Sequence, residues 1–206
     1  MLKTEVVKIS ARSPEKELIE KGAKAIREGK LVIFPTETVY GIAVNVLDKE
    51  ALEKLYQVKG RQKQKPFSWH IAELSQLESE LQDPPKWLHR FLSEFWPGPL
   101  TVVLNVKSGK TRGFRMPDHP VALALIKASR VPVVAPSANL SGQKPPLTVK
   151  EALKDLDGKV DLALDAGKTI VKQESTVLDL SGKKPKILRE GALSKEKIDS
   201  WFKKNQ

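Results

Sequence analysis

The chain has 206 residues, of which 40% are hydrophobic and 30% are charged, with a net charge of +11 and no cysteine. This length and composition predict one soluble globular domain, and the lack of cysteine excludes disulfides and thiolate chemistry. No apolar run approaches the roughly 20 residues of a membrane span, and the N-terminus lacks the apolar stretch of a secretory signal, so we expect a cytoplasmic protein with no membrane partner.

The first half of the chain is expected to alternate helices with short strands. A helix should begin at 13–15, where a serine cap precedes proline and glutamate, and should end at Gly29. An apolar strand over 31–34 follows, and a second helix is opened by Asp48 and ended near Gly60. The other elements predicted here are a strand over 67–71 and an apolar helix over 88–95, which is stopped by Pro97-Gly98-Pro99.

The second half is expected to consist mainly of strands joined by loops rich in proline, glycine and serine. Thr148 and Glu151 have the spacing of a capping box at a helix start, and Ser194 precedes a last amphipathic helix. The predicted strands are 100–106, 131–135, 160–164, 175–180 and 187–188, and the predicted loops are 107–120, 136–147 and 181–186. Helices and strands alternate irregularly, so the sequence predicts an α/β domain with a mixed sheet.

Residues 32–44 read VIFPTETVYGIAV, in which two apolar β-type segments flank a group of polar residues. A hairpin can be closed by much less, for instance by Asn-Gly or Asp-Gly. Two threonine hydroxyls, a carboxylate and a tyrosine hydroxyl offer many hydrogen-bonding groups within a few residues. The sequence therefore raises the question of what these groups hold.

A second polar stretch is the run KGRQKQKP at 59–66, which places four cations just after a predicted helix. Lysine offers a point charge and arginine a planar fork, and both suit phosphate oxygens. The net charge likewise favours a nucleotide or nucleic-acid partner. A solvated loop is the commoner explanation of such a run, and solubility or heat adaptation would also explain the charge.

Other stretches are weaker candidates for a site. APSANLSG at 135–142 follows a predicted strand, where α/β sheets gather ligands, although a self-bonded polar turn explains it as well. Arg115 is expected in a proline-bracketed loop, where it suits a carboxylate ligand or an ordinary surface ion pair. Ser175 opens a strand and Arg189 ends a short apolar run, and each is a weak signal alone.

Several chemistries lack their motifs. There is no G-x-x-x-x-G-K-[ST] phosphate loop, no G-x-G-x-x-G dinucleotide loop and no G-x-S-x-G nucleophile elbow. The histidines, His70, His89 and His119, have no zinc-like spacing, so we expect no protein metal site. His70 ends a strand after the basic run, and both a ligand-facing and a structural role are open for it.

Taken in order, PTETVYG, KGR followed by KP, FWPGPLT, FRMPDHP, APSAN-SG, STVLDL and ILREG resemble the YrdC/Sua5 family of L-threonylcarbamoyladenylate synthases. The match covers about residues 10–195 of a single YrdC-like domain, 1–206. It implies a twisted mixed sheet surrounded by helices, with a basic concave face. It also implies condensation of L-threonine, bicarbonate and ATP to L-threonylcarbamoyladenylate and pyrophosphate. That product would serve N6-threonylcarbamoyladenosine formation at position 37 of tRNAs that read codons beginning with A.

The resemblance also implies roles for residues that match the family's motifs. Lys59 and Arg61 would be catalytic cations. The threonine-binding residues would be Thr36, Thr38, Tyr40, His70, Arg115 and Ser175, with Arg115 on the carboxylate. The ATP-binding residues would be Lys59, Arg61, Lys65, Thr111, Ser137, Asn139, Pro145 and Arg189. Mg²⁺ would be carried by the ATP phosphates, because the sequence offers no clustered carboxylates.

The chain departs from the family pattern in places. The family usually has proline after KGR and leucine after the later proline, where this chain has Gln62 and Phe67. The chain stops at Gln206 and so resembles the short, single-domain branch, with other proteins transferring the threonylcarbamoyl group to tRNA. Two alternatives are a module that binds tRNA or double-stranded RNA, for which RRM and KH motifs are lacking, and a carbamoyl-transfer enzyme, whose zinc-binding cysteines are lacking.

Overall fold

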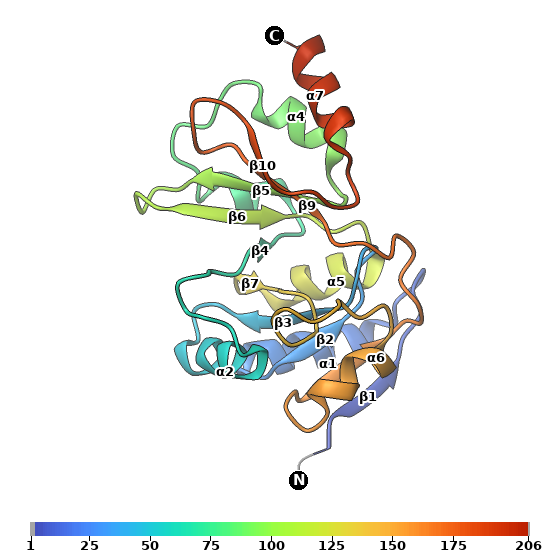
Figure 1. Ribbon diagram of the computed structural model, residues 1–206. Helices are drawn as coiled ribbons and strands as arrows, with labels where there is room; N and C mark the ends of the chain where they lie inside the picture. The colour runs from blue at the N-terminus through green and yellow to red at the C-terminus, as the bar shows by residue number, and fades with distance from the viewer. Residues whose placement is uncertain (1–2, 206) are drawn as a thin grey trace.

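One mixed sheet runs through the molecule, with its strands in the order β1-β8-β2-β3-β7-β4-β6-β5-β9-β10 (Figure 1). The computed structural model describes residues 3–205. Its strands are β1 (Glu5–Lys8), β2 (Val32–Phe34), β3 (Gly41–Asn45), β4 (Trp69–His70), β5 (Leu100–Asn105), β6 (Thr111–Arg115), β7 (Val133–Val134), β8 (Leu162–Asp165), β9 (Thr176–Asp179) and β10 (Lys186–Arg189). Its helices are α1 (Lys16–Arg27), α2 (Lys49–Lys59), α3 (Leu74–Glu78), α4 (Leu88–Phe95), α5 (Pro120–Ser129), α6 (Val149–Leu156) and α7 (Lys195–Lys204). The sheet contains both parallel and antiparallel pairs, which confirms the predicted mixed α/β class.

Three strands near one end of the sheet, β8, β2 and β3, are covered by helices on both faces (Figure 1). α1 and α5 pack on one face, where Ile26 and Leu125 are buried, and α2 and α6 pack on the other, where Leu55 and Leu156 are buried. Every residue of β2 is buried, which explains why its sequence is continuously apolar rather than alternating. None of the helices formed by residues 3–205 combines the length and the apolar character needed to span a bilayer.

The other end of the sheet has its own core, formed with α4 and α7. The predicted apolar stripe of α4 packs on β5, β6 and β9 together with the last helix. Phe91 of α4 and Trp201 of α7 meet edge to face, with ring centroids 5.0 Å apart. The sheet therefore has separate cores at its two ends, and the middle strands β3, β7 and β4 connect them.

The predicted hairpin and the helix after it are confirmed. β2 and β3 pair antiparallel, with Phe34 opposite Gly41, so that residues 35–40 form the turn. α2 is capped by Asp48, whose carboxylate accepts two backbone N–H groups, and it ends at Gly60 in the left-handed conformation, with φ of 58°. The α2 boundaries therefore follow directly from local sequence signals.

The predicted loop at 107–120 is wrong in its middle part. Residues 111–115 form β6, which pairs antiparallel with β5 and parallel with β4, so Arg115 ends a strand instead of lying in a loop. The strand was not predicted because Gly113 lies in its middle, and glycine usually weakens a strand. A Cβ atom at Gly113 would lie 2.7 Å from Ser68 Oγ, so the close approach of the segment at Ser68, just before β4, explains the glycine.

The start of α1 differs from the prediction, the capping box at the start of α6 is only half formed, and α5 was missed altogether. α1 begins two residues later than Ser13 predicted, because Glu15 is still extended, with φ of −66° and ψ of 124°, and serves as the N-cap. Thr148 does cap α6, since its hydroxyl accepts the N–H of Glu151 at 3.1 Å. The carboxylate of Glu151 accepts the N–H of Leu147 instead of closing the box on Thr148.

Candidate functional site

The turn between β2 and β3 is held together by one hydroxyl. Thr36 Oγ1 lies 2.8 Å from Thr38 Oγ1, donates to the carbonyl of Val39 at 2.6 Å, and accepts the backbone N–H groups of Thr38 and Val39 at 3.2 Å. Thr36 is buried and its hydrogen bonds are used within the turn. They fix the positions from which Thr38 and Glu37 meet the rest of the site.

Arg115 reaches this turn from the end of β6. Its Nη2 donates to Glu37 Oε1 and to Thr38 Oγ1, both at 2.7 Å. The side chains of Arg115 and Glu37 are only 6% and 8% exposed, so this is a buried ion pair. The hydroxyl of Thr38 can in turn donate to Thr36 Oγ1, which gives a continuous chain of hydrogen bonds from the guanidinium into the turn.

His70 stands beside Arg115 because β4 and β6 pair in parallel with these two residues opposite each other. Burial, and after it the positive charge of Arg115, lowers the pKa of His70 to about 3. The imidazole is therefore neutral at physiological pH, and it meets Phe34 edge to face at 6.5 Å between ring centroids. The structure thus brings four of the six predicted threonine-site residues together: Thr36, Thr38, His70 and Arg115.

The other two predicted threonine-site residues make different contacts. The Tyr40 hydroxyl donates to the carbonyl of Gly167 at 2.6 Å and accepts the N–H of Ala166 at 3.1 Å, and burial raises its pKa. It therefore fastens the segment that follows β8. Ser175 Oγ lies 2.9 Å from Thr101 Oγ1, and no hydrogen bond among residues 3–205 links Ser175 to the turn.

Lys59 is a buried cation at the end of α2. Its Nζ donates to the carbonyls of Ser137 and Asn139 at 2.5 and 2.7 Å, and its own carbonyl accepts the N–H of Ser141 at 2.8 Å. Burial, and after it the charge of Arg61, lowers the pKa of Lys59 to about 8. The lysine therefore joins the KGR and APSAN motifs into one unit.

The loop after β7 is shaped by its asparagine and tied to the hairpin turn. Asn139 Nδ2 donates to the carbonyls of Leu140 and Gln143, both at 2.8 Å. The N–H of Ala138 donates to the carbonyl of Tyr40 at 2.8 Å. The loop that carries the predicted ATP residues therefore lies directly against the segment that carries the predicted threonine residues.

Arg61 folds back over its own loop. Its Nε donates to the carbonyl of Lys65 at 2.8 Å and its Nη2 to that of Pro66 at 3.3 Å, with the guanidinium 5.0 Å from the Phe67 ring centroid. Burial lowers the pKa of Arg61, and the charge of Arg189 contributes to the same effect. Arg61 and Arg189, although far apart in the sequence, therefore lie close enough for their charges to interact.

Arg189 reaches this region from β10. Its Nη1 donates to Glu174 Oε1 at 2.8 Å and its Nη2 to the carbonyl of Ser175 at 2.8 Å. The charge of Glu174 also raises the pKa of Lys59, against the larger effect of burial. The segment before β9 therefore connects Ser175 with the cations predicted to bind ATP.

Two predicted ATP residues are less central. Thr111 is exposed at the turn end of the β5–β6 hairpin, four residues from Arg115, which is about 13 Å along a strand. Pro145 is half-buried, and the carbonyl of the next residue, Pro146, accepts the N–H of Tyr40 at 3.0 Å. The structure therefore ties the residue next to Pro145 to the hairpin turn and leaves Thr111 at the far end of its strand.

Three side chains that complete these clusters were missed in the sequence: Glu37, Thr101 and Glu174. Glu37 carried a signal, because a carboxylate between two threonines and beside an apolar strand needs a partner when it is buried. Glu174 stands next to the nominated Ser175. Thr101 lies in an apolar strand, and nothing in the sequence distinguishes it from its neighbours.

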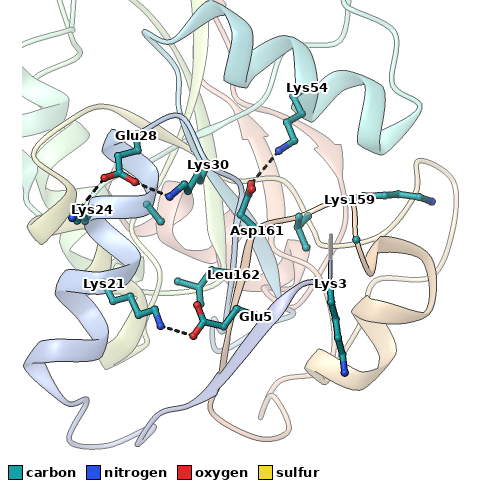
Figure 2. A pocket seen from close by; sticks show the side chains of 13 residues that line it. Lys3, Glu5, Lys21, Lys24, Glu28, Lys30, Lys54, Lys159, Asp161 and Leu162 are labelled. Atoms are coloured by element: carbon teal, nitrogen blue, oxygen red, sulfur yellow. Dashed lines mark hydrogen bonds and ion pairs between the residues drawn. The ribbon is translucent and has the colours of Figure 1, made fainter. Parts of the chain in front are cut away.

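A cavity of about 400 Å³ lies beside the first residues of the parallel strands β2 and β8, away from the hairpin turn that follows β2 (Figure 2). Lysines and acids line it and pair with one another, as in Lys30–Glu28 at 2.7 Å and Lys54–Asp161 at 3.1 Å. β2 and β8 begin beside this cavity and end at the hairpin turn and at the segment fastened by Tyr40. None of the predicted site residues lines this cavity.

Two buried clusters lie side by side in this α/β domain: the arginine cluster of Arg115, Glu37, Thr38 and His70, and the lysine cluster of Lys59 with the loop at 137–141. The family model Sua5_yciO_yrdC, described as "Telomere recombination", matches residues 24–191, and the chain belongs to this Sua5/YciO/YrdC family.

Several known proteins are similar to this chain over most of its length. A threonylcarbamoyl-AMP synthase of Bacillus subtilis is 40% identical, over 93% of this chain and 58% of its own length. The crystal structure of Pyrococcus abyssi Sua5 complexed with L-threonine matches with a TM-score of 0.91 and 39% identity, over 96% of this chain and 60% of that one. A protein of Methanocaldococcus jannaschii is 35% identical over 96% of this chain and 98% of its own length. The chain therefore spans little more than half the length of the first two relatives.

Proposed function

We propose that this domain is an L-threonylcarbamoyladenylate synthase, a nucleotidyltransferase that condenses L-threonine, bicarbonate and ATP and releases pyrophosphate. The product would serve N6-threonylcarbamoyladenosine formation at position 37 of tRNAs that read codons beginning with A. The observation that carries the proposal is the buried Arg115–Glu37 pair next to the loop held by Lys59. The synthase relative and the threonine complex of Sua5 support it.

The arginine cluster would bind the amino acid. Arg115 would take the substrate carboxylate, because a guanidinium offers several N–H donors in a planar fork. Thr38 and the neutral imidazole of His70 would meet the polar groups of threonine nearby. Water is largely excluded here, so each of these hydrogen bonds is stronger than it would be at the surface.

The lysine cluster would bind the triphosphate. An ammonium has three N–H donors, and Lys59 uses two of them on loop carbonyls, so one remains for a phosphate oxygen. Arg61 and Arg189 would add positive charge from two other elements. Mg²⁺ would ride on the ATP phosphates, since no group of three or more His, Asp or Glu within 3–205 is placed to hold a metal ion.

The reaction needs no covalent nucleophile from the protein. The threonine amine would be carboxylated, and a carbamate oxygen would then attack the α-phosphorus in line and displace pyrophosphate. Catalysis would come from holding the two reactants in contact and from cations that offset the negative charge developing on the phosphates. The direct contact between the two loops supports this geometry, because each loop carries one substrate's residues.

We further propose that the enzyme works in the cytoplasm and passes its product to separate proteins that transfer the threonylcarbamoyl group. Contact with tRNA or double-stranded RNA remains a proposal that rests on the net charge of +11. RNA binding through phosphates alone would weaken steeply with salt and would not respond to threonine. That difference separates an RNA-binding module from the synthase.

The test is pyrophosphate release from ATP with threonine, with serine or without an amino acid, each with and without added bicarbonate. We expect release that requires threonine and bicarbonate, and threonylcarbamoyl-AMP detectable by mass spectrometry. Threonine and ATP should also raise the melting temperature, because each binds the folded state. Pyrophosphate release that ignores threonine, or no release at all, would overturn the proposal.

A further inference from the structure

Three buried polar atoms around Arg115 have no hydrogen-bond partner among the described residues. They are Glu37 Oε2, Arg115 Nε and His70 Nδ1. The three residues are only 5–6% exposed. Buried polar atoms are almost always paired in folded proteins, so three unpaired ones in one place indicate a ligand that pairs them.

The three atoms belong to side chains that are already in contact or in register. Arg115 holds Glu37 through Oε1, which leaves the second carboxylate oxygen free. His70 and Arg115 are opposite each other on neighbouring parallel strands, so their side chains lie on one face of the sheet. Nδ1 of the neutral His70 imidazole has no partner among the described residues, so it is free to accept a hydrogen bond or, in the other tautomer, to donate one.

The set of free atoms matches an α-amino acid. It offers one acceptor, Glu37 Oε2, one donor, Arg115 Nε, and the neutral His70 Nδ1, which can accept or donate according to its tautomer. An α-amino acid has an ammonium with three donors and a carboxylate that only accepts. The Arg115–Glu37 pair is neutral as a unit and so is the zwitterion, so the two can be buried together without a net charge. In this arrangement the arginine faces the carboxylate and the glutamate faces the ammonium.

We infer that Glu37 binds the α-ammonium of the substrate through Oε2 and takes up its proton when the nitrogen is carboxylated. This inference rests on the proposed function, which supplies the amino acid and bicarbonate. The nitrogen forms a bond to the bicarbonate carbon, and the C–OH bond of bicarbonate breaks. One ammonium proton leaves with that hydroxide as water, a second goes to Glu37, and the carbamate keeps the third.

Glu37 is better suited to this task than the groups around it. The titratable groups that face it are Arg115 from β6, His70 from β4 and His119 at the start of α5. Arg115 cannot accept a proton, and the pKa of about 3 makes His70 a weak base. His119 Nδ1 already accepts the N–H of Val121. Glu37 therefore has a free oxygen that can both face the ammonium and accept its proton.

The test compares Glu37→Gln with wild type in threonine-dependent pyrophosphate release from about pH 7 to about pH 9.5 at saturating bicarbonate. Glutamine can still accept the hydrogen bond of Arg115 but cannot take a proton. We expect turnover to fall on the order of 10²-fold or more near pH 7. The deficit should shrink as pH rises, because solvent then deprotonates the threonine amine. Taking the ratio to wild type cancels the titration of other groups, including Lys59.

Two further variants make the result decisive. Glu94→Gln removes the same charge from an exposed position on α4 and should match wild type at every pH. Glu37→Asp retains a base, so it should lose less activity than Glu37→Gln and keep the pH profile of wild type. It also serves if the glutamine variant does not fold.

Each outcome has one meaning. Inactive wild-type enzyme would overturn the proposed function and this inference with it. Active wild type with full activity in Glu37→Gln, or with a deficit that is the same at every pH, would overturn the inference alone. Equal losses in Glu37→Asp and Glu37→Gln would also overturn it, because only one of them lacks a base.

Discussion

Two ion pairs of equal length show how differently charge is used at the opposite ends of strands β2 and β8. Arg115 and Glu37 are 2.7 Å apart, and so are Lys30 and Glu28 beside the cavity in Figure 2. The first pair is 6% and 8% exposed, whereas the second is 50% and 41% exposed. Buried charges are costly and are kept only with good partners, whereas exposed pairs contribute little. Burial, rather than distance, therefore distinguishes the Arg115–Glu37 pair, for which we propose a role in ligand binding, from the Lys30–Glu28 pair.

The two regions also differ in what they leave unpaired. Around the cavity the acids and lysines largely pair with one another, as Lys24 and Lys30 both do with Glu28. Around Arg115 the buried partners leave one atom of each residue free. Incomplete pairing in a buried place is what a bound ligand can complete. The predictions below test this comparison, from the largest expected effect to the smallest.

The strongest test is Arg115→Ala, which leaves Glu37 buried without its partner. We expect a loss of about 3–5 kcal/mol in the free energy of unfolding, measured by urea titration. In kinetics, the threonine requirement should rise roughly thirtyfold, and much more than the ATP requirement, since a charged hydrogen bond to a carboxylate contributes about 2 kcal/mol. A shift in the ATP requirement instead would contradict our assignment of Arg115.

A double variant, Arg115→Leu with Glu37→Leu, sharpens this result. Removing both charges should restore most of the stability, because a hydrophobic pair carries no desolvation cost. Activity should not return. A double variant that stays as unstable as Arg115→Ala would show that the pair is held for packing reasons.

The buried imidazole predicts acid sensitivity. Folding lowers the pKa of His70 to about 3, so below about pH 6.5 the unfolded chain binds the proton that the folded chain refuses. The free energy of unfolding should therefore decrease as the pH is lowered below about 6.5, and the loss should reach about 3 kcal/mol near pH 4. This part of the loss should vanish in His70→Gln. Urea titrations at neutral and acid pH measure it. His89→Gln, at an exposed position, is the control and should keep the acid loss.

Lys59→Met tests the second buried cation. Turnover should fall on the order of 10²-fold, because a positive charge is lost where the phosphates develop charge. Folding lowers the lysine pKa to about 8, so the unfolded chain holds more protons above that pH, and wild-type stability should rise with pH relative to the variant. Between neutral pH and about pH 9.5, the free energy of unfolding of the wild type should gain about 2 kcal/mol relative to that of the variant.

Lys63→Met is the matched control for this variant. Lys63 belongs to the same basic run but pairs with Glu53 at the surface. We expect turnover and the pH dependence of unfolding to stay close to wild type. If both lysines gave equal losses, net charge rather than position would explain the effect.

The smallest effect should come from the cavity end. Lys30→Met should change the free energy of unfolding by less than about 1 kcal/mol and leave the threonine and ATP requirements unchanged. Added salt should reduce even this change, because exposed charges are screened. Loss of activity here would show that the cavity and the Arg115 cluster, at opposite ends of β2, are coupled, and would contradict the comparison.

The parts that could be predicted from the sequence are those set by local signals. The α2 boundaries came from Asp48 and Gly60, and the β2–β3 hairpin came from two apolar segments around a polar turn. β6 and α5 were missed because Gly113 and the prolines around Arg115 suggested a loop. Those residues are explained only by the neighbouring strand, which the sequence does not place.

The same distinction holds for the candidate site. The motif positions nominated residues that the structure does bring together, such as Lys59 with the loop at 137–139. Their partners were not predictable, because each contact joins distant segments: Arg115 to Glu37 across 78 positions, for example. Tyr40 shows the converse, since a tyrosine hydroxyl in a polar turn gives no sign that it will fasten the backbone after β8.

The position of β8 in the sheet has a consequence for synthesis on the ribosome. β8 inserts between β1 and β2, the first two strands to be made, and Thr4 reaches a carbonyl 156 residues further along. Until the chain has been translated past residue 165, β1 has no partner strand and one edge of β2 stays open. Pairing across such a separation is slow, and open strand edges recruit other chains. A nascent chain that stalls before β8 is therefore expected to aggregate through β2 or to be held by chaperones, even though α1, α2 and the hairpin have already been made.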